Sequence, residues 1–522
     1  MAGPLKLSAF NSSDDPLVAL GGRNQATYLR HYLADLHAAT VLTEPAYFDR
    51  DYLSEFAAFY GVSARGYSNR CQRCHYFSVT VTRAQLRAAV GGSSRAHRRL
   101  QDNYLGFVVV RPIPAAPLGR TVVRWYEDQL PTTPRVTDPA RAYEVHLAGI
   151  TLRVTGLAWQ QQDTGVGACA TIALWTMLHA SAFDDHHAIP TTADITRFAH
   201  QTAALGARVF PSAGLTIHQV CEAIKESGLA PVVLQGDKPD GTGMGFSPER
   251  FRSACGSLLR SGYPVLVLGE FEKSRGRHAV CAVGFREAAA TKPIGGQVEL
   301  QDAAIPNLYL HDDNLGPGVR FAVEETQTGV VRLKAKAPPP RHQLALPADP
   351  TVAYPGLIPS QLVVAVHEDL RTSPDRLHRA ALTLARAIIT AYGHVARSEK
   401  LTPPEIGLTV STRFIKLHRY VGDELARLLA GSPALGRTRL ALCERVAPMS
   451  LHLGVVRIGW EAAPLIDVLY DTTDSDKNLW PYANVQFHPL VGQIVDVLVA
   501  RGQINVGQAV IAYADPTDDQ LD

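Results

Sequence analysis

The chain has 522 residues, of which 46% are apolar and 19% charged, a composition typical of folded globular domains and not of disordered or fibrous proteins. Because hydrophobic cores rarely grow beyond about 250–300 residues, this length predicts several domains. The formal net charge is +2 with both signs interspersed. No charged stretch is typical of a nucleic-acid-binding protein, so we expect no nucleic-acid partner.

Three further features concern the cellular compartment. The first residues lack a basic segment followed by an apolar one, so we predict no signal peptide. No apolar stretch approaches the roughly 18 residues of a transmembrane helix, so we expect no membrane partner. The seven cysteines are odd in number and scattered, unlike a disulfide framework. These features favour a cytoplasmic protein with reduced thiols.

The first 150 residues predict a mixed region of helices and strands whose role the sequence does not reveal. Apolar side chains spaced three and four apart predict helices at 28–36 and 52–60. Strands are expected at 107–110, 121–123 and 143–152. Cys71, Cys74 and His75 match both a haem-attachment pattern and half of a zinc site. We interpret them as structural, because haem attachment requires export and no second pair of zinc ligands follows.

The middle of the chain predicts helices first and strands afterwards. An uncharged helix is expected from Cys169 to Phe183, then helices near 217–224 and from Pro248, with Ser247 at the capping position. Strands are predicted at 231–235, 264–271, 278–285, 297–301, 308–312, 319–324 and 330–334. This segregation of helices and strands predicts an α+β fold with a largely antiparallel sheet.

Prolines at 337–340 and 346–350 follow this sheet and predict a stiff linker over residues 336–356. Beyond it, Ser373 caps a helix that we expect to end at Gly393. Strands are predicted at 406–411, 450–459 and 464–470. The expected domains are therefore 1–150, 151–335 and 357–522, with α+β regions of unassigned role on both sides of the middle domain.

The most informative segment is 159–175, where a run of glutamines and then two glycines precede Cys169. A cysteine that opens a helix has free backbone N–H groups and the positive end of the helix dipole beside its sulfur, and both favour the nucleophilic thiolate. The side-chain amide of a glutamine in this run can supply a second donor for the oxyanion that forms during acyl transfer. The segment therefore predicts a thiol nucleophile.

A base and an orienting group for this thiol lie downstream. His278 opens a short apolar segment typical of a buried strand, and the next predicted strand ends in Asp312 and Asp313. A carboxylate at the end of the neighbouring strand can hold the imidazole in the right tautomer and stabilise the imidazolium. The ordered set of a glutamine, Cys169, His278 and an aspartate at a strand end therefore predicts nucleophilic catalysis.

Residues 155–325 resemble the papain-like cysteine peptidases, and within them the bacterial double-glycine leader peptidase-like branch. The resemblance lies in Gly-Ala-Cys-Ala-Thr-Ile-Ala-Leu-Trp, Arg-His-Ala-Val-Cys-Ala-Val-Gly-Phe and Leu-Tyr-Leu-His-Asp-Asp. It implies a core in which a central helix packs against an antiparallel sheet. It also implies Cys169 as nucleophile, His278 as general base, Asp312 as orienter and Gln162 as oxyanion donor, with no cofactor and no metal.

Three positions depart from the pattern of that family. Gln162 lies seven residues before Cys169, where the family usually has six, and Ala170 follows the cysteine where the family has glycine. Asp313 follows Asp312 where the family has proline. Either aspartate therefore stays open as the orienter, and we prefer Asp312 because of its position after the apolar strand residues.

Four weaker signals have ordinary structural interpretations. Gly241–Gly245 lies between a strand and a helix but lacks a phosphate-binding signature, so we interpret it as a loop. Asp474–Asn478 lacks the glycine and glutamate of a calcium loop and is interpreted as a polar turn. Asp184–His187 is interpreted as the solvated end of the central helix, not a metal site. Strand alternation places Cys281 on the face opposite His278, in the core.

The sequence thus predicts a cysteine peptidase-like hydrolase that cleaves a peptide or peptide-like bond in a protein or peptide substrate. Two alternatives stay open: an acyltransferase that uses the same triad, and a catalytically silent binding or regulatory scaffold. We expect the flanking regions to shape the cleft or to recognise a protein partner.

Overall fold

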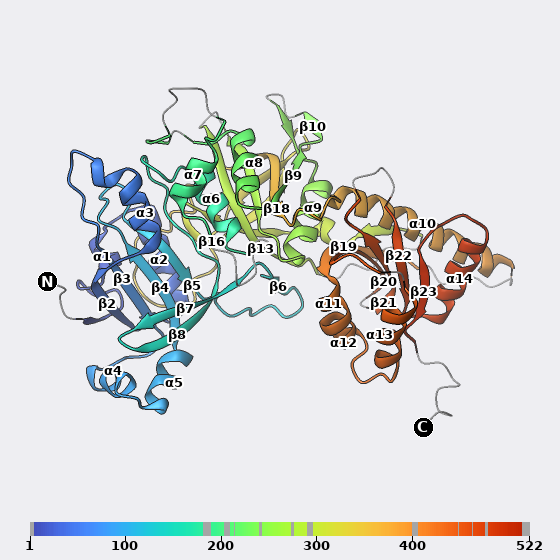
Figure 1. Ribbon diagram of the computed structural model, residues 1–522, viewed down its shortest axis with the longest axis horizontal. Helices are drawn as coiled ribbons and strands as arrows, with labels where there is room; N and C mark the ends of the chain where they lie inside the picture. Colours follow the sequence, from blue (N-terminus) through green and yellow to red (C-terminus); the bar gives the residue numbers. More distant parts are fainter. Residues whose placement is uncertain are drawn as a thin grey trace.

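The computed structural model describes residues 5–180, 189–202, 209–212, 214–239, 243–272, 276–289, 296–398, 406–446, 448–461, 463–474 and 479–513. Three sheets of five, eight and six strands follow one another along the chain, each accompanied by helices (Figure 1). The predicted α+β class is confirmed at this coarse level. Asp184–His187 and residues 241–242 and 475–478 lie outside the described residues. Met244–Gly245, interpreted as part of a loop, form the two-residue strand β11, which pairs with β10 (Lys238–Pro239).

The first sheet is antiparallel. Its strands in spatial order are β1 (Lys6–Ala9), β2 (Thr40–Tyr47), β3 (Cys71–Phe77), β4 (Tyr104–Val110) and β5 (Leu118–Val123). The helices of this region are α1 (Pro16–Ala19), α2 (Asn24–Asp35), α3 (Arg50–Ala58), α4 (Arg83–Val90) and α5 (Ser94–Asp102). Cys71 and Cys74 are buried on β3, as a structural role requires.

The segment expected to form one strand at 143–152 is instead a hairpin of β7 (Arg141–Leu147) and β8 (Ile150–Gly156). Leu147 pairs with Ile150, so only Ala148 and Gly149 form the turn. Both residues have positive φ, the geometry of the two-residue turn that joins tightly twisted strands. The alternating apolar pattern shifts its phase at this turn, from Val145 and Leu147 to Ile150 and Leu152, which is the signal that the prediction of a single strand at 143–152 overlooked.

The second sheet closes into a ring of six antiparallel strands. They are β12 (Val265–Phe271), β13 (Arg277–Arg286), β15 (Asn307–Asp312), β16 (Gly316–Glu325), β17 (Val331–Ala335) and β18 (Leu357–Val366). β18 returns to pair with β12, and closure leaves no free edge within the ring. β9 (Ala230–Gln235) adds to β18, and β6 (Arg135–Val136) adds to β13. The sheet of the middle region thus continues past the expected linker to Val366.

Helix α6 (Cys169–Leu178) packs against β13, β12 and β18 of this ring. Every residue of α6 after Cys169 is buried, as its uncharged sequence predicted. One apolar core joins Trp175 of α6 to Cys281 of β13 and to Tyr52 and Val109 of the N-terminal region. The central helix therefore lies between the ring and the N-terminal region.

Three more helices accompany the ring: α7 (Thr192–Phe198), α8 (Ile217–Glu226) and α9 (Pro248–Arg260). The predicted helices at 217–224 and from Pro248 are confirmed as α8 and α9. Ser247 precedes α9 but does not cap it, because its hydroxyl donates to Asp237 Oδ2 at 2.6 Å.

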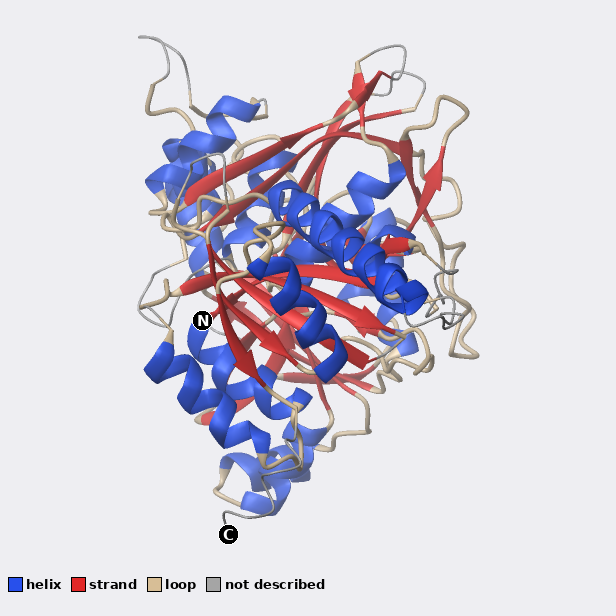
Figure 2. Cartoon of the chain, turned by 90° about the vertical axis from the view of Figure 1, so that its right-hand side faces the viewer, coloured by secondary structure: helices blue, strands red, loops and turns tan. Residues whose placement is uncertain are grey.

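The third sheet carries β14 (Val298–Leu300), β19 (Leu408–Lys416), β20 (His452–Trp460), β21 (Ala463–Asp471), β22 (Pro481–Gln486) and β23 (Gln508–Ile511). Helices α10 (Pro374–Ser398) and α14 (Pro489–Ala500) cover one face of it (Figure 2). The remaining helices of this region are α11 (Leu417–Arg419), α12 (Leu425–Leu428) and α13 (Ala434–Arg445). β14 precedes the ring strand β15 in sequence, so the middle region contributes an edge strand here.

Helix α10 continues past Gly393, where we expected it to end. A glycine inside a helix costs roughly 1 kcal/mol relative to alanine, which the packing of α10 on β19 and β20 offsets. Among the described helices none is long and apolar enough to cross a lipid bilayer.

Closure of the ring depends on a close approach at Gly269 of β12, where the register with β18 shifts. A Cβ atom there would lie 2.4 Å from the backbone oxygen of Ile358. We expect Gly269→Ala to lower the free energy of unfolding by about 1–3 kcal/mol, because overpacking forces the two strands apart. Urea denaturation measures this effect.

The control for this prediction is Gly436→Ala in α13, where a Cβ would meet no atom within 4 Å. Alanine favours the helix there and is expected to be neutral or to stabilise by up to about 1 kcal/mol. Equal effects of the two substitutions would contradict the close approach of β12 and β18 at Gly269.

Candidate active site

Cys169 is the first residue of α6 and is half-buried, whereas the rest of the helix is buried. Ala168 precedes it in extended conformation, and no side chain caps the first turn. The free N–H groups of this turn and the positive end of the helix dipole therefore face the sulfur of Cys169. This is the environment that the sequence predicted for a nucleophilic thiol.

Asp163 shapes the turn before this helix. Its Oδ1 accepts hydrogen bonds from the backbone N–H groups of Gly165, Val166 and Gly167 at 2.7, 2.6 and 3.1 Å. A Cβ on Gly165 would lie 2.7 Å from the ring of Phe59, which explains the need for glycine. Asp163 thus has a structural role in this turn.

Buried charges tie this turn to the N-terminal region. Arg111 Nη1 lies 2.8 Å from Glu55 Oε2 and 3.5 Å from Asp163 Oδ2. Gln160 and Thr192 donate to Glu55 Oε1 at 2.5 and 2.8 Å. Burial raises the pKa of Glu55 to about 7, although Arg111 opposes this shift. α3 therefore fixes the backbone on which the glutamine run and the turn before Cys169 lie.

The three glutamines of this run have different hydrogen-bond partners. Gln160 binds Glu55, and Gln161 accepts from the N–H of Leu118. Gln162 instead donates through Nε2 to Asn314 Oδ1 at 2.8 Å. Asn314 Nδ2 lies 3.5 Å from the Nε2 atom of His278, so Gln162 is the glutamine that joins the histidine cluster.

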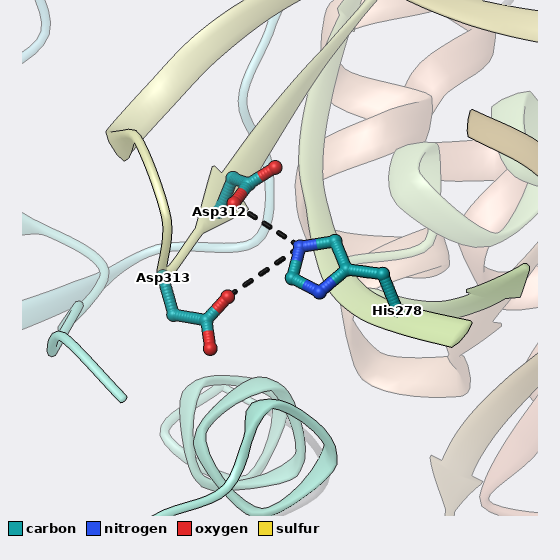
Figure 3. Close-up of side chains that lie close together, drawn as sticks. All are labelled: His278, Asp312 and Asp313. Atoms are coloured by element: carbon teal, nitrogen blue, oxygen red, sulfur yellow. Dashed lines mark hydrogen bonds and ion pairs between the residues drawn. The ribbon is translucent and has the colours of Figure 1, made fainter. Parts of the chain in front are cut away.

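His278 is the second residue of β13, and Asp312 ends β15, its neighbour in the ring. The predicted adjacency of these two strands is confirmed. His278 Nε2 lies 3.2 Å from Asp312 Oδ1 and 3.5 Å from Asp313 Oδ1 (Figure 3). The thiol of Cys169 is a further neighbour of the imidazole and raises the pKa of His278. Because several polar groups crowd Nε2, we assign the thiol to the Nδ1 side of the ring.

These neighbours make His278 strongly basic. Burial alone would lower its pKa. The charge and hydrogen bond of Asp312, the contact with Cys169 and the charge of Asp313 outweigh burial and raise the pKa of His278 well above its usual value. The ring therefore favours the imidazolium form that pairs with a thiolate.

The two aspartates differ in their hydrogen bonds. Asp312 Oδ1 accepts from the N–H of Asn314 at 2.9 Å, and Oδ2 accepts from Tyr354 Oη at 2.8 Å. Neither carboxylate oxygen of Asp313 has a well-aligned donor among the described residues. Burial raises the pKa of Asp313, as does the charge of Asp312, while His278 lowers it. This geometry favours Asp312 as the orienter, our preferred choice.

Sequence reasoning missed several side chains of this site. Tyr354 comes from the segment expected to be a linker, and no local pattern indicated its contact with Asp312. Phe271 of β12 stacks on the imidazole with centroids 4.9 Å apart and 21° between the planes. Asn314 was detectable only from its position two residues after Asp312.

The assembled groups include a thiol, a basic imidazole, an orienting carboxylate and amide donors, the set used in acyl transfer. His278, Asp312 and Asp313 also have the composition of a metal site. No protein-family model, curated protein or solved structure matches this chain. The function is therefore argued from the geometry of the site.

We expect Arg111→Met to lower the free energy of unfolding by about 3–5 kcal/mol at pH 8, because it leaves two buried carboxylates without their cation. The loss should be smaller at pH 5. The pKa of Glu55 is already raised in the folded state and rises further without Arg111, so at pH 5 the folded variant keeps Glu55 protonated. Urea unfolding at both pH values measures the difference.

Arg153→Met is the matched control, because Arg153 pairs with Glu144 on the surface and its side chain is 70% exposed. Removing such a pair should cost less than about 1 kcal/mol at either pH. Similar losses for both variants would show that the Arg111 network does not hold the turn.

Proposed function

We propose that the protein is a papain-like thiol hydrolase that cleaves a peptide or peptide-like bond. The observation that carries this proposal is the buried pair of His278 and Asp312, whose Nε2 and Oδ1 atoms lie 3.2 Å apart, with the thiol of Cys169 among the neighbours that raise the pKa of His278. The packing of α6 against a closed antiparallel sheet supports a papain-like core. The resemblance in residues 155–325 points the same way.

In the proposed reaction, Cys169 transfers its proton to His278 Nδ1, and the thiolate attacks the substrate carbonyl carbon. Asp312 holds the ring and stabilises the imidazolium. His278 then protonates the leaving amine as the tetrahedral intermediate collapses to a thioester. A water molecule gives one proton to His278 and attacks the thioester, which releases the acid and restores the thiol.

The oxyanion of both tetrahedral intermediates needs hydrogen-bond donors. We assign the backbone N–H of Cys169 and the side-chain amide of Gln162 to this role. Gln162 Nε2 carries two N–H groups, and only one of them is needed for the bond to Asn314. Asn314 thus orients the carboxamide, and the second N–H is free for the oxyanion.

A peptide bond suits this site because its leaving amine is a poor leaving group until it is protonated. His278 accepts a proton from Cys169 and is the group from which the leaving amine can take it. Acyl transfer to an amine or thiol would use the same residues and differs only in what attacks the thioester. The nature of the acceptor must therefore be measured.

The first prediction of this proposal concerns the reactivity of Cys169. With iodoacetamide at pH 6, Cys169 should react faster than the exposed Cys443 by roughly an order of magnitude or more, because the pair with His278 maintains the thiolate. Burial raises the pKa of the thiols of Cys71, Cys74, Cys255 and Cys281. These four should react most slowly in the peptide map.

His278→Gln is the control, since it should slow alkylation of Cys169 and leave Cys443 unaffected. A Cys169 no more reactive than Cys443 in the unmodified chain would favour the catalytically silent scaffold over the enzyme.

The second prediction concerns the reaction. When a peptide library is incubated with the enzyme in ¹⁸O-water, new C-termini should carry one ¹⁸O atom, because water resolves the thioester. Asp312→Asn should lower the cleavage rate by about 10²- to 10⁴-fold, since asparagine holds a hydrogen bond but does not stabilise the imidazolium. Asp313→Asn should lower it much less. Mass spectrometry of the products gives both results.

The same experiment with an added amine or thiol tests acyl transfer. Transferred products in clear excess over ¹⁸O-labelled acids would make the protein an acyltransferase. A larger loss for Asp313→Asn than for Asp312→Asn would transfer the orienting role to Asp313.

A further inference from the structure

The buried cluster of His278, Asp312 and Asp313 has the spacing of a transition-metal site (Figure 3). One donor atom from each side chain lies within 4.8 Å of the others. The imidazole Nε2 is 3.2 Å from one carboxylate and 3.5 Å from the other. Two ligand atoms of a tetrahedral zinc ion, each at about 2.1 Å from it, lie roughly 3.4 Å apart. Zinc therefore fits between these atoms with little rearrangement.

Asp313 gives a second, independent reason to expect a cation. Its side chain is 2% exposed, and neither carboxylate oxygen has a well-aligned donor among the described residues. His278 Nε2 carries at most one proton, and Asp312 Oδ1 lies closer to it than Asp313 does. A buried carboxylate without a partner is costly. A divalent ion satisfies both carboxylates and the ring nitrogen at once.

We propose that His278, Asp312 and Asp313 bind a divalent transition-metal ion of the zinc type, and that this ion inhibits the enzyme. The inhibitory half of this inference rests on the proposed function. Binding replaces the proton on Nε2, which is released to solvent, and leaves a neutral imidazole with its proton on Nδ1. The Nδ1 proton of this neutral ring is less acidic than that of an imidazolium, so His278 no longer protonates the leaving amine efficiently.

The proposed ligand set excludes the thiol, which distinguishes it from a site made of cysteine and histidine. We assign Cys169 to the Nδ1 side of the ring, whereas both carboxylates face Nε2. The ion therefore has one nitrogen and two oxygen ligands from the protein, with the remaining position open to water.

The test is calorimetric titration of the full chain with zinc chloride, together with absorption spectra of the cobalt-loaded protein. Asp313→Asn should weaken zinc binding by more than the roughly 10–100-fold that loss of an outer-shell partner costs. Cys169→Ser should leave the affinity unchanged, and the cobalt spectrum should lack thiolate-to-metal charge transfer. His367→Ala is the control, because His367 and His452 form a second histidine pair, 5.1 Å apart. It too should leave the affinity unchanged.

Unchanged affinity in Asp313→Asn, lost affinity in Cys169→Ser or His367→Ala, or a thiolate charge-transfer band would overturn the metal site. Thermal unfolding without metal checks that Asp313→Asn is folded, and the cobalt spectrum of the unmodified chain tests the ligand set without any variant. Zinc should also slow cleavage of the peptide library by the unmodified chain but not by Asp313→Asn. Zinc that binds without slowing cleavage would overturn the inhibition.

These measurements separate the two proposals. Zinc binding that depends on Asp313 in a protein with an unreactive Cys169 would retain the metal site and refute the hydrolase. A reactive Cys169 in a protein that binds no zinc would retain the hydrolase and refute the metal site.

Discussion

The buried ion pair of Arg111 with Glu55 and Asp163 is the interaction on which the candidate site depends. A charge buried without compensation costs several kcal/mol, so these three side chains are stable only when all are present and correctly placed. They come from the β4–β5 connection, from α3 and from the turn before α6. Their mutual dependence fixes the position of Cys169 relative to the N-terminal region.

This ion pair gives the first 150 residues a structural role in the candidate site. Sequence analysis treated them as a flanking region of unassigned role. In the structure their apolar side chains share a core with α6, and Glu55 binds Gln160, two residues before the proposed oxyanion donor Gln162. The N-terminal region is therefore part of the framework of the site, whatever it also recognises.

The local parts of the site were predictable from sequence because each depends on a short pattern. An uncharged stretch after two glycines indicated the helix that Cys169 opens, and a short apolar run indicated the strand that His278 begins. The contact between His278 and Asp312 also required β13 and β15 to be neighbours, although β14 lies between them in sequence and joins the third sheet. The catalytic roles of these residues stay predictions.

Two features were not predictable from short patterns: the closure of the sheet and the contact of Tyr354 with Asp312. β18 follows a proline-rich segment and pairs with β12, almost a hundred residues earlier, and no local pattern specifies such a register. Tyr354 reaches Asp312 only because that closure brings the segment before β18 over the site. Long-range pairing, and not secondary-structure propensity, decides both features.

The energetic cost of burying Asp313 argues against a purely structural role for the cluster of His278, Asp312 and Asp313. A stable core pairs its buried charges, yet Asp313 is buried without a well-aligned donor beside another carboxylate. A half-buried thiol lies on the opposite side of the same imidazole. Proteins retain such local costs mainly where a site needs them, since random substitution would readily remove an unpaired buried carboxylate. The carboxylate of Asp313 stabilises a positive charge in this cluster, whether that charge is on His278 during catalysis or on a bound metal ion.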